Sequence, residues 1–249
     1  MNNQIVESSG DNRTGGKVTM EETIKTAVGA AKMTNPSQGD ASALADNRIL
    51  YMKESDFVGT LPKPSSLKGM ISSVREKILQ GDHTFLDKLG ERLAFERTGT
   101  RLYEALISKH KGSVQENSLP ELSILEQFCS EERDHFELCA KVIEELGGDS
   151  TAVTPSADIC GVAAQGWMQV LTDPRTTFQQ SLEIILQAEL ADNNCWENLI
   201  ELAENLGLED VVEKFSQAKE EEDVHLTTIT QWVKELNLNG GKLLPIEIQ

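Results

Sequence analysis

The chain has 249 residues, of which 39% are hydrophobic and 26% are charged, and its formal net charge is −18 at pH 7. This acidic balance argues against direct binding to nucleic acid, because basic side chains are needed to neutralise phosphates. An acidic surface instead favours solubility and attracts cations.

The apolar segments and the cysteines of the sequence further narrow the class of protein. The sequence has no run of about 18 apolar residues and no apolar segment near its N-terminus, so we predict neither a membrane span nor a secretory signal. Its four cysteines form no Cys-x-x-Cys pair, which excludes a zinc ribbon and a rubredoxin-type iron centre. Free thiols are typical of a reducing compartment, so we expect a cytoplasmic protein.

The N-terminal part, residues 1–65, is predicted to be a flexible extension. It is rich in Asn, Ser and Gly at its start, and a capping box at residues 19–22 predicts a short helix to about residue 32. Two prolines within residues 61–64 predict an extended linker. A short helix in residues 66–81 is expected to pack on the following domain or lead into it.

Four long helical patterns follow in residues 82–237, and residues 238–249 form a tail. We predict helices at about 83–111, 118–146, 174–206 and 208–237, and a short helix at about 156–171 within the long second connection. Asp82, Ser118, Thr154 and Asp173 are the expected residues at helix starts.

The chain contains one helical hairpin twice. The pattern Leu-x-x-Glu, six residues, then aromatic-Glu-x-Leu-Ile occurs at residues 93–107 and again at 186–200. Each copy is followed by Glu-x-x-His at matched distance from the end of the next helix. The first hairpin therefore contains Glu96, Glu132 and His135. The second contains Glu189, Glu222 and His225.

The Glu-x-x-His spacing predicts a metal site. Residues three apart lie on one helix face, so a carboxylate and an imidazole can converge on one ion. Carboxylates with two imidazoles suit Fe²⁺ or Mn²⁺ better than thiophilic metals. The alternative is an ordinary solvated acidic face. Glu131 and Glu221 lie four residues before each histidine, so spacing alone leaves a register shifted by one residue open.

Residues 82–237 resemble the ferritin-like superfamily of di-iron carboxylate proteins, which includes ferritins, bacterioferritins, rubrerythrins and bacterial di-iron oxidases. The resemblance implies an all-α four-helix bundle with a long crossover between its second and third helices. It implies six ligands to two iron or manganese ions: Glu96, Glu132, His135, Glu189, Glu222 and His225. In that family pattern Glu132 and Glu222 would bridge the two ions.

Three neighbouring residues refine this expectation. Rubrerythrin-like sites have an extra carboxylate where Asp192 stands, so Asp192 is predicted to be a seventh ligand or a ligand's partner, with a solvated surface residue as the alternative. Tyr103 occupies the place of a tyrosine beside the ferritin oxidation site. It is a candidate catalytic residue or a packing residue. Gly99, near Glu96, leaves room for an apolar substrate channel.

The function that this resemblance implies is an oxidoreductase that reacts with O₂ or H₂O₂, as a ferroxidase, peroxidase or oxidase. Electrons would come from a separate donor, because the chain lacks a rubredoxin-type centre. The alternatives are iron storage, oxygenation of an organic substrate, and a structural module stabilised by metal. We expect no nucleic-acid or membrane partner, and the sequence leaves a homodimer open.

Overall fold

The structure is a computed structural model that describes residues 29, 42–54, 59–60, 72–79, 83–113 and 120–240. These residues contain helices and no strand. The helices are α2 (Ser42–Glu54), α3 (Ser72–Leu79), α4 (Thr84–Gly112), α5 (Leu122–Glu145), α6 (Pro155–Thr172), α7 (Phe178–Asn205) and α8 (Glu209–Leu238). The all-α prediction is therefore confirmed for the described part of the chain.

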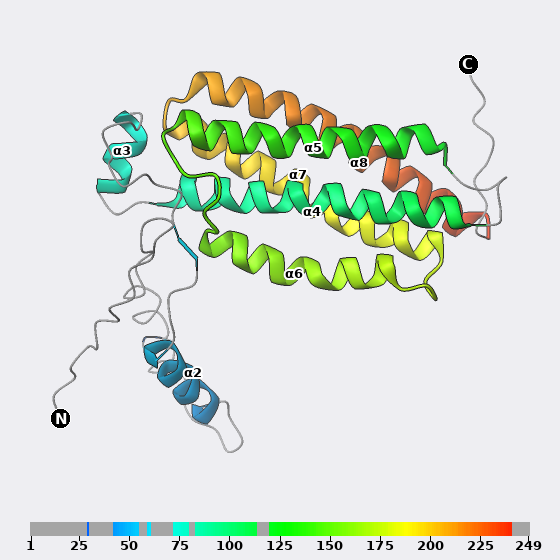
Figure 1. The fold of residues 1–249 in the computed structure, drawn as a ribbon, viewed down its shortest axis with the longest axis horizontal. Helices are drawn as coiled ribbons and strands as arrows, with labels where there is room; N and C mark the ends of the chain where they lie inside the picture. The colour runs from blue at the N-terminus through cyan, green and yellow to red at the C-terminus, as the bar shows by residue number, and fades with distance from the viewer. Residues whose placement is uncertain are drawn as a thin grey trace.

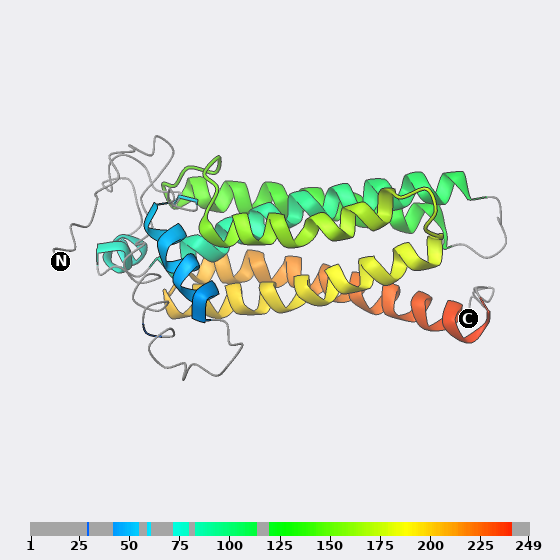
Figure 2. The same ribbon diagram turned by 90° about the horizontal axis from the view of Figure 1, so that it is seen from below.

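The four long helices form one bundle (Figures 1 and 2). Helices α4 and α5 are joined as one antiparallel hairpin and α7 and α8 as the other, and α4 also packs on α7 and α5 on α8. Helix α6 belongs to the connection between the two hairpins and lies along α4 on the outside of the bundle. This crossover lets the second hairpin lie beside the first.

Local sequence explains where α6 begins. Its N-cap is Thr154, whose hydroxyl accepts a hydrogen bond from the Ala157 amide, and Pro155 occupies the first turn, as the sequence predicted. The Asp87 carboxylate of α4 accepts bonds from the amide and hydroxyl of Ser156, at 2.9 and 2.7 Å. A side chain at Gly90 would collide with Thr154, so this glycine allows α6 to start close against α4.

The start of α7 differs from the prediction. Asp173 does not cap α7 but follows the end of α6, and its carboxylate binds Arg175. The N-cap of α7 is Thr177, which forms a capping box with Gln180. The prediction placed this start too early because Asp-Pro is also a common way to leave a helix.

Glycines end the second and third long helices. Gly147 and Gly207 have φ angles of 83° and 67°, a left-handed conformation that costs glycine little. The amides that follow them return to the carbonyls of Ile143 and Ala203, at 2.7 and 3.1 Å. This hydrogen-bonded ending satisfies carbonyl groups that the helix leaves free and turns the chain back.

The N-terminal segment contains one further described helix. Helix α2 lies within the residues that we predicted as a flexible extension, and it stands apart from the bundle near the end at which α4 begins (Figure 1). Helix α4 begins after His83, without a side-chain cap. The capping box predicted at residues 19–22, the prolines of residues 61–64, and the helix-start residues Asp82 and Ser118 lie outside the described residues.

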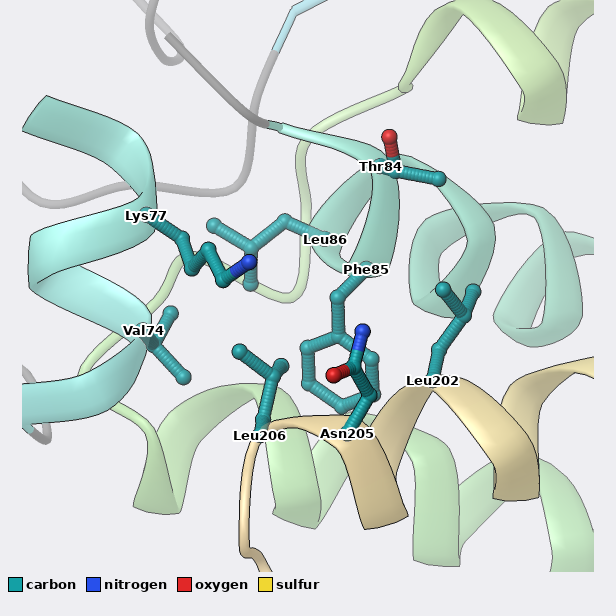
Figure 3. A pocket seen from close by; sticks show the side chains of 8 residues that line it. All are labelled: Val74, Lys77, Thr84, Phe85, Leu86, Leu202, Asn205 and Leu206. Atoms are coloured by element: carbon teal, nitrogen blue, oxygen red, sulfur yellow. The ribbon is translucent and has the colours of Figure 1, made fainter. Parts of the chain in front are cut away.

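Helix α3 packs against that same end of the bundle. Val74 is buried there, and Figure 3 shows it facing a small cavity together with Phe85 of α4 and Leu206, the residue that follows α7. Further back in the chain, the Thr60 amide donates a 2.5 Å hydrogen bond to the carbonyl of Val153. Among the described residues before α4, Val74 therefore contacts the bundle and Thr60 contacts the connection that precedes α6. None of the residues lining the cavity is a predicted metal ligand.

The apolar core consists of two clusters that occupy opposite ends of the bundle. One is built around Leu89, Ile143, Trp196 and Phe215. The other is built around the following residues: Leu106, Leu125, Phe128, Leu182, Ile229 and Trp232. Between these clusters, the middle of the bundle contains buried polar and charged side chains. No helix in the described residues has the length and apolar character needed to cross a membrane.

Candidate metal centre

All six predicted ligands lie in this polar middle layer, and so does Asp192. Each of these side chains is at most 3% exposed: Glu96 of α4, Glu132 and His135 of α5, Glu189 and Asp192 of α7, and Glu222 and His225 of α8. The structure therefore brings together residues that are far apart in the sequence. Their role as ligands stays a prediction.

The two Glu-x-x-His motifs face inward in the expected register. Glu132 is 2% exposed and Glu222 is fully buried, whereas the side chains of Glu131 and Glu221 are 22% and 40% exposed. The register shifted by one residue would need the two more exposed carboxylates to point inward. The burial of Glu132 and Glu222 therefore favours the register with these two residues inward over the register shifted by one residue, which spacing alone left open.

One group of donor atoms forms around His135. Its Nδ1 lies 2.7 Å from Glu222 Oε1 and 3.8 Å from Glu96 Oε2. Donor atoms of these three residues lie within 4.8 Å of one another, which is close enough to share one ion. We call this the Glu96 position.

A second group forms around His225. Its Nδ1 lies 3.2 Å from Glu222 Oε2, 3.7 Å from Glu132 Oε1 and 4.0 Å from Glu189 Oε2. Donor atoms of these four residues also lie within 4.8 Å of one another. We call this the Glu189 position. Glu222 belongs to both groups, with one oxygen facing each histidine, so it would be a ligand that the two groups share.

The outer nitrogen of each histidine is held by a glutamate from the opposite hairpin. His135 Nε2 lies 2.8 Å from Glu221 Oε2, and His225 Nε2 lies 2.8 Å from Glu131 Oε2. A carboxylate at Nε2 favours a proton there, which leaves the Nδ1 lone pair directed into the site. Sequence reasoning treated Glu131 and Glu221 only as a register alternative. Their matched place before each motif was the available signal.

The donor atoms are poorly satisfied without a cation. Both oxygens of Glu222, one oxygen each of Glu132 and Glu189, and Nδ1 of both histidines lack a hydrogen bond of ordinary geometry. Burying polar and charged groups in this way is costly. Two divalent ions placed among these atoms would offset that cost, so the residues fit a dinuclear site.

The pKa values of the carboxyl groups show the same excess of negative charge. Burial, together with the charge of Glu222, raises the pKa of Glu189 to about 8 and that of Glu132 well above its usual range. Burial also acts to raise the pKa of Glu222, but the close approach of the two imidazoles, whose Nδ1 atoms lie 2.7 and 3.2 Å from its oxygens, outweighs burial and lowers that pKa. Without metal, protons must neutralise part of the site, so binding of divalent ions should release them.

Tyr103 contacts a predicted ligand directly. Its hydroxyl donates a 2.5 Å hydrogen bond to Glu189 Oε1, and its ring meets the His225 ring edge-on at 6.0 Å. Burial and the nearby Glu189 charge raise the pKa of Tyr103, so the phenol stays protonated. Trp196, the counterpart of Tyr103 in the second hairpin, makes a similar edge contact with His135 at 5.8 Å.

Arg92 is a charged residue of this layer that sequence reasoning missed. It is 1% exposed, its Nε lies 2.6 Å from Glu96 Oε1, and its Nη2 forms an ion pair with the Asp192 carboxylate. Its place four residues before Glu96, on the same helix face, was the available signal. Because Asp192 is 1% exposed and paired in this way, the solvated-surface alternative for Asp192 is wrong.

Gly99 does not open a channel beside the metals. A side chain at this position would collide with Oε2 and Cδ of Glu132. The space that the missing side chain leaves is therefore filled by a predicted bridging ligand. The substrate channel that we inferred from Gly99 has no support here.

Comparison with protein families agrees with this architecture. The model of the ferritin-like domain matches residues 86–239, which is more than half of the chain. The chain therefore belongs to the ferritin-like family. Comparisons with curated proteins and with solved structures found no match.

Proposed function

We propose that the protein binds two iron ions, or two manganese ions, and acts as an oxidoreductase towards O₂ or H₂O₂. One observation carries the proposal: carboxylates and imidazoles from four helices converge in a buried layer, and their inward atoms lack hydrogen-bond partners. A solvated acidic face would not be buried between two apolar clusters. Hard oxygen donors with two nitrogens favour iron or manganese.

Six residues would hold the metals: Glu96, Glu132, His135, Glu189, Glu222 and His225. Two adjacent redox-active ions, when bound, supply two electrons to one oxidant. Glu131 and Glu221 orient the two imidazoles through their Nε2 atoms. Tyr103 holds Glu189 by a hydrogen bond in which the hydroxyl oxygen lies 2.5 Å from Glu189 Oε1, so its proton is directed at that carboxylate. The flanking apolar clusters exclude bulk water from the layer.

The electrons needed for repeated turnover are expected to come from a separate donor. The sequence has no Cys-x-x-Cys pair that would build a rubredoxin-type centre, and its four cysteines are free thiols. A donor that is a separate protein fits this composition.

The test is an anaerobic titration with Fe²⁺, followed by mixing with O₂ or H₂O₂ in a stopped-flow instrument. We expect two ions per chain and rapid oxidation of both. The variant His135→Ala/His225→Ala should lose this oxidation, whereas Asp134→Ala, an exposed change within the same motif, should keep it. Tight binding of two ions that stay inert to both oxidants would overturn the redox proposal and favour a structural metal module.

The same titration separates the proposal from iron storage. Storage predicts uptake of many ions per chain and a large closed assembly in size-exclusion chromatography. A monomer or dimer that stops at two ions per chain would exclude it. Oxidation that becomes fast only when an organic compound is added would instead favour an oxygenase.

A further inference from the structure

The two metal positions have different surroundings, although the hairpins that build them share one pattern. In the repeat, Arg92 of α4 corresponds to Ile185 of α7, and Gly99 of α4 corresponds to Asp192 of α7. Arg92 and Ile185 are each 1% exposed. A permanent positive charge is therefore buried beside the Glu96 position and has an apolar counterpart in the other hairpin.

Arg92 is fixed by contacts on several sides. Its Nη1 donates a 3.1 Å hydrogen bond to the backbone carbonyl of Asp192, whose carboxylate pairs with Nη2. Its guanidinium carbon lies 4.3 Å from the ring centre of Phe95 and 5.4 Å from that of Trp196. A guanidinium held between rings and carboxylates has little freedom to move away when a metal ion arrives.

The contact with Glu96 matters most for metal binding. Glu96 Oε1 lies 2.6 Å from Arg92 Nε, while Oε2 is the oxygen nearer to His135. An ion at the Glu96 position would have to share this carboxylate with a cation that is already there. At the Glu189 position, the carboxylate of Glu189 is instead held by the neutral hydroxyl of Tyr103.

The number of available donors points the same way. Four side chains can surround an ion at the Glu189 position, but only three form the group around His135. Asp192 lies near enough to join Glu96, Glu132 and Glu222 in a further group, yet its carboxylate is engaged by Arg92. The fourth donor that would make the two positions equal is thus held by the arginine.

We propose that Arg92 makes the two metal positions unequal, so that the Glu189 position fills first and the Glu96 position second, with lower affinity. Arg92 acts as a positioning residue that withholds Asp192 and part of Glu96 from the second ion. This inference rests on the proposed two-metal site but not on its redox chemistry. Hydrogen bonds to charged groups correspond to about ten- to a hundredfold in a binding constant, and we expect the two dissociation constants to differ by about that factor.

The first experiment is anaerobic calorimetric titration of the full chain with Mn²⁺, which needs no turnover. The unchanged chain should bind two ions in two resolved steps. His225→Ala should lose the tight step, and His135→Ala should keep it and lose the weak one. Equal affinities in the unchanged chain, or the reverse pattern in the two variants, would overturn the proposal.

The repeat supplies a second experiment. The double variant Arg92→Ile/Asp192→Gly gives each hairpin the residue that its counterpart already has. It removes both partners of the Arg92–Asp192 pair, and Glu96 loses its contact with Arg92. Glu96 is then no longer shared with Arg92, so the two dissociation constants should move closer together, and an unchanged ratio between them would contradict the role of Arg92. Circular dichroism checks that the variant folds. If it does not, the two histidine variants still decide the order of filling.

These outcomes distinguish this inference from the proposed function. A chain that binds no metal would contradict both the proposed function and the inference about Arg92. Two equal steps followed by rapid oxidation would end only the inference about Arg92. Two unequal steps in a site that stays inert to O₂ and H₂O₂ would end only the redox proposal.

Discussion

The α4–α5 and α7–α8 hairpins present the same metal-binding pattern in different packing. Each contributes one lone glutamate and one Glu-x-x-His, and each holds the other's histidine through a glutamate at 2.8 Å. The residues around these groups differ. Phe128 lies over the His225 ring at 4.1 Å, whereas the corresponding position of the second hairpin is Ala218.

This difference separates the part of the pattern that metal ligands would require from the part that packing leaves free. Ligand geometry demands the same donors at the same spacing in both hairpins, because both must reach ions in one layer. Packing demands only that the space be filled, so aromatic, aliphatic and small residues can exchange between the hairpins. Substitutions at ligands, at their hydrogen-bond partners and at packing residues should therefore differ in their effects on stability and on metal affinity.

Removal of the metals should have the largest effect, because both hairpins depend on them to neutralise the buried layer. With free metal at about a thousand times its dissociation constant, linkage gives about 4 kcal/mol of stabilisation, or roughly 10 °C in Tm for a domain of this size. Differential scanning calorimetry with and without a chelator measures this shift. Glu132→Ala/Glu222→Ala should not show it, and a chelator-insensitive Tm in the unchanged chain would contradict the prediction.

Gly99→Ala should come next, because it changes packing at a place where packing and a ligand meet. The added methyl group collides with Glu132, so we expect about 3 kcal/mol of destabilisation or displacement of that carboxylate with weaker metal binding. Gly161→Ala is the matched control, since nothing lies within 4 Å of its added side chain and it should stabilise α6 slightly. Urea unfolding gives the stability of both variants, and metal titration gives their affinity. If Gly99→Ala had the same stability and affinity as Gly161→Ala, the Glu132 side chain would not lie against Gly99.

The two outer glutamates test the symmetry of the hairpins directly. Glu131→Gln and Glu221→Gln each remove a charge that orients a histidine, and such changes cost about ten- to a hundredfold in metal affinity. Glu131 is less exposed than Glu221, at 22% against 40%, so water can replace its charge less well and its substitution should cost more. Metal titration of both variants measures the difference, and a larger loss in Glu221→Gln would reverse the expected order.

Tyr103→Phe should have the smallest of these effects. It removes one hydrogen bond to Glu189, worth about 1 kcal/mol in the metal-free protein. Tyr51→Phe is the control, because Tyr51 is 74% exposed and its substitution should leave stability unchanged. Chemical unfolding of the metal-free variants gives both values. A loss in Tyr103→Phe no greater than in Tyr51→Phe would mean that this hydrogen bond adds nothing to stability.

The helices and the inward face of each motif could be predicted from sequence because they depend on local spacing. Residues three apart on one helix share a face whatever surrounds it, so Glu132 with His135 and Glu222 with His225 were readable from the chain alone. The repeated hairpin added the lone glutamates Glu96 and Glu189. The start of α7 was predicted wrongly at Asp173, because an aspartate followed by proline is common both at the end of one helix and at the start of the next.

Only the tertiary structure decided which groups meet across helices. The pairing of Arg92 with Asp192, of Glu131 with His225, and the fit of Glu132 against Gly99 join residues that are distant in the sequence. Such contacts depend on the axial register and rotation of packed helices, which side-chain shapes along the whole interface determine together. Sequence spacing places a residue on a face, but packing decides what that face meets.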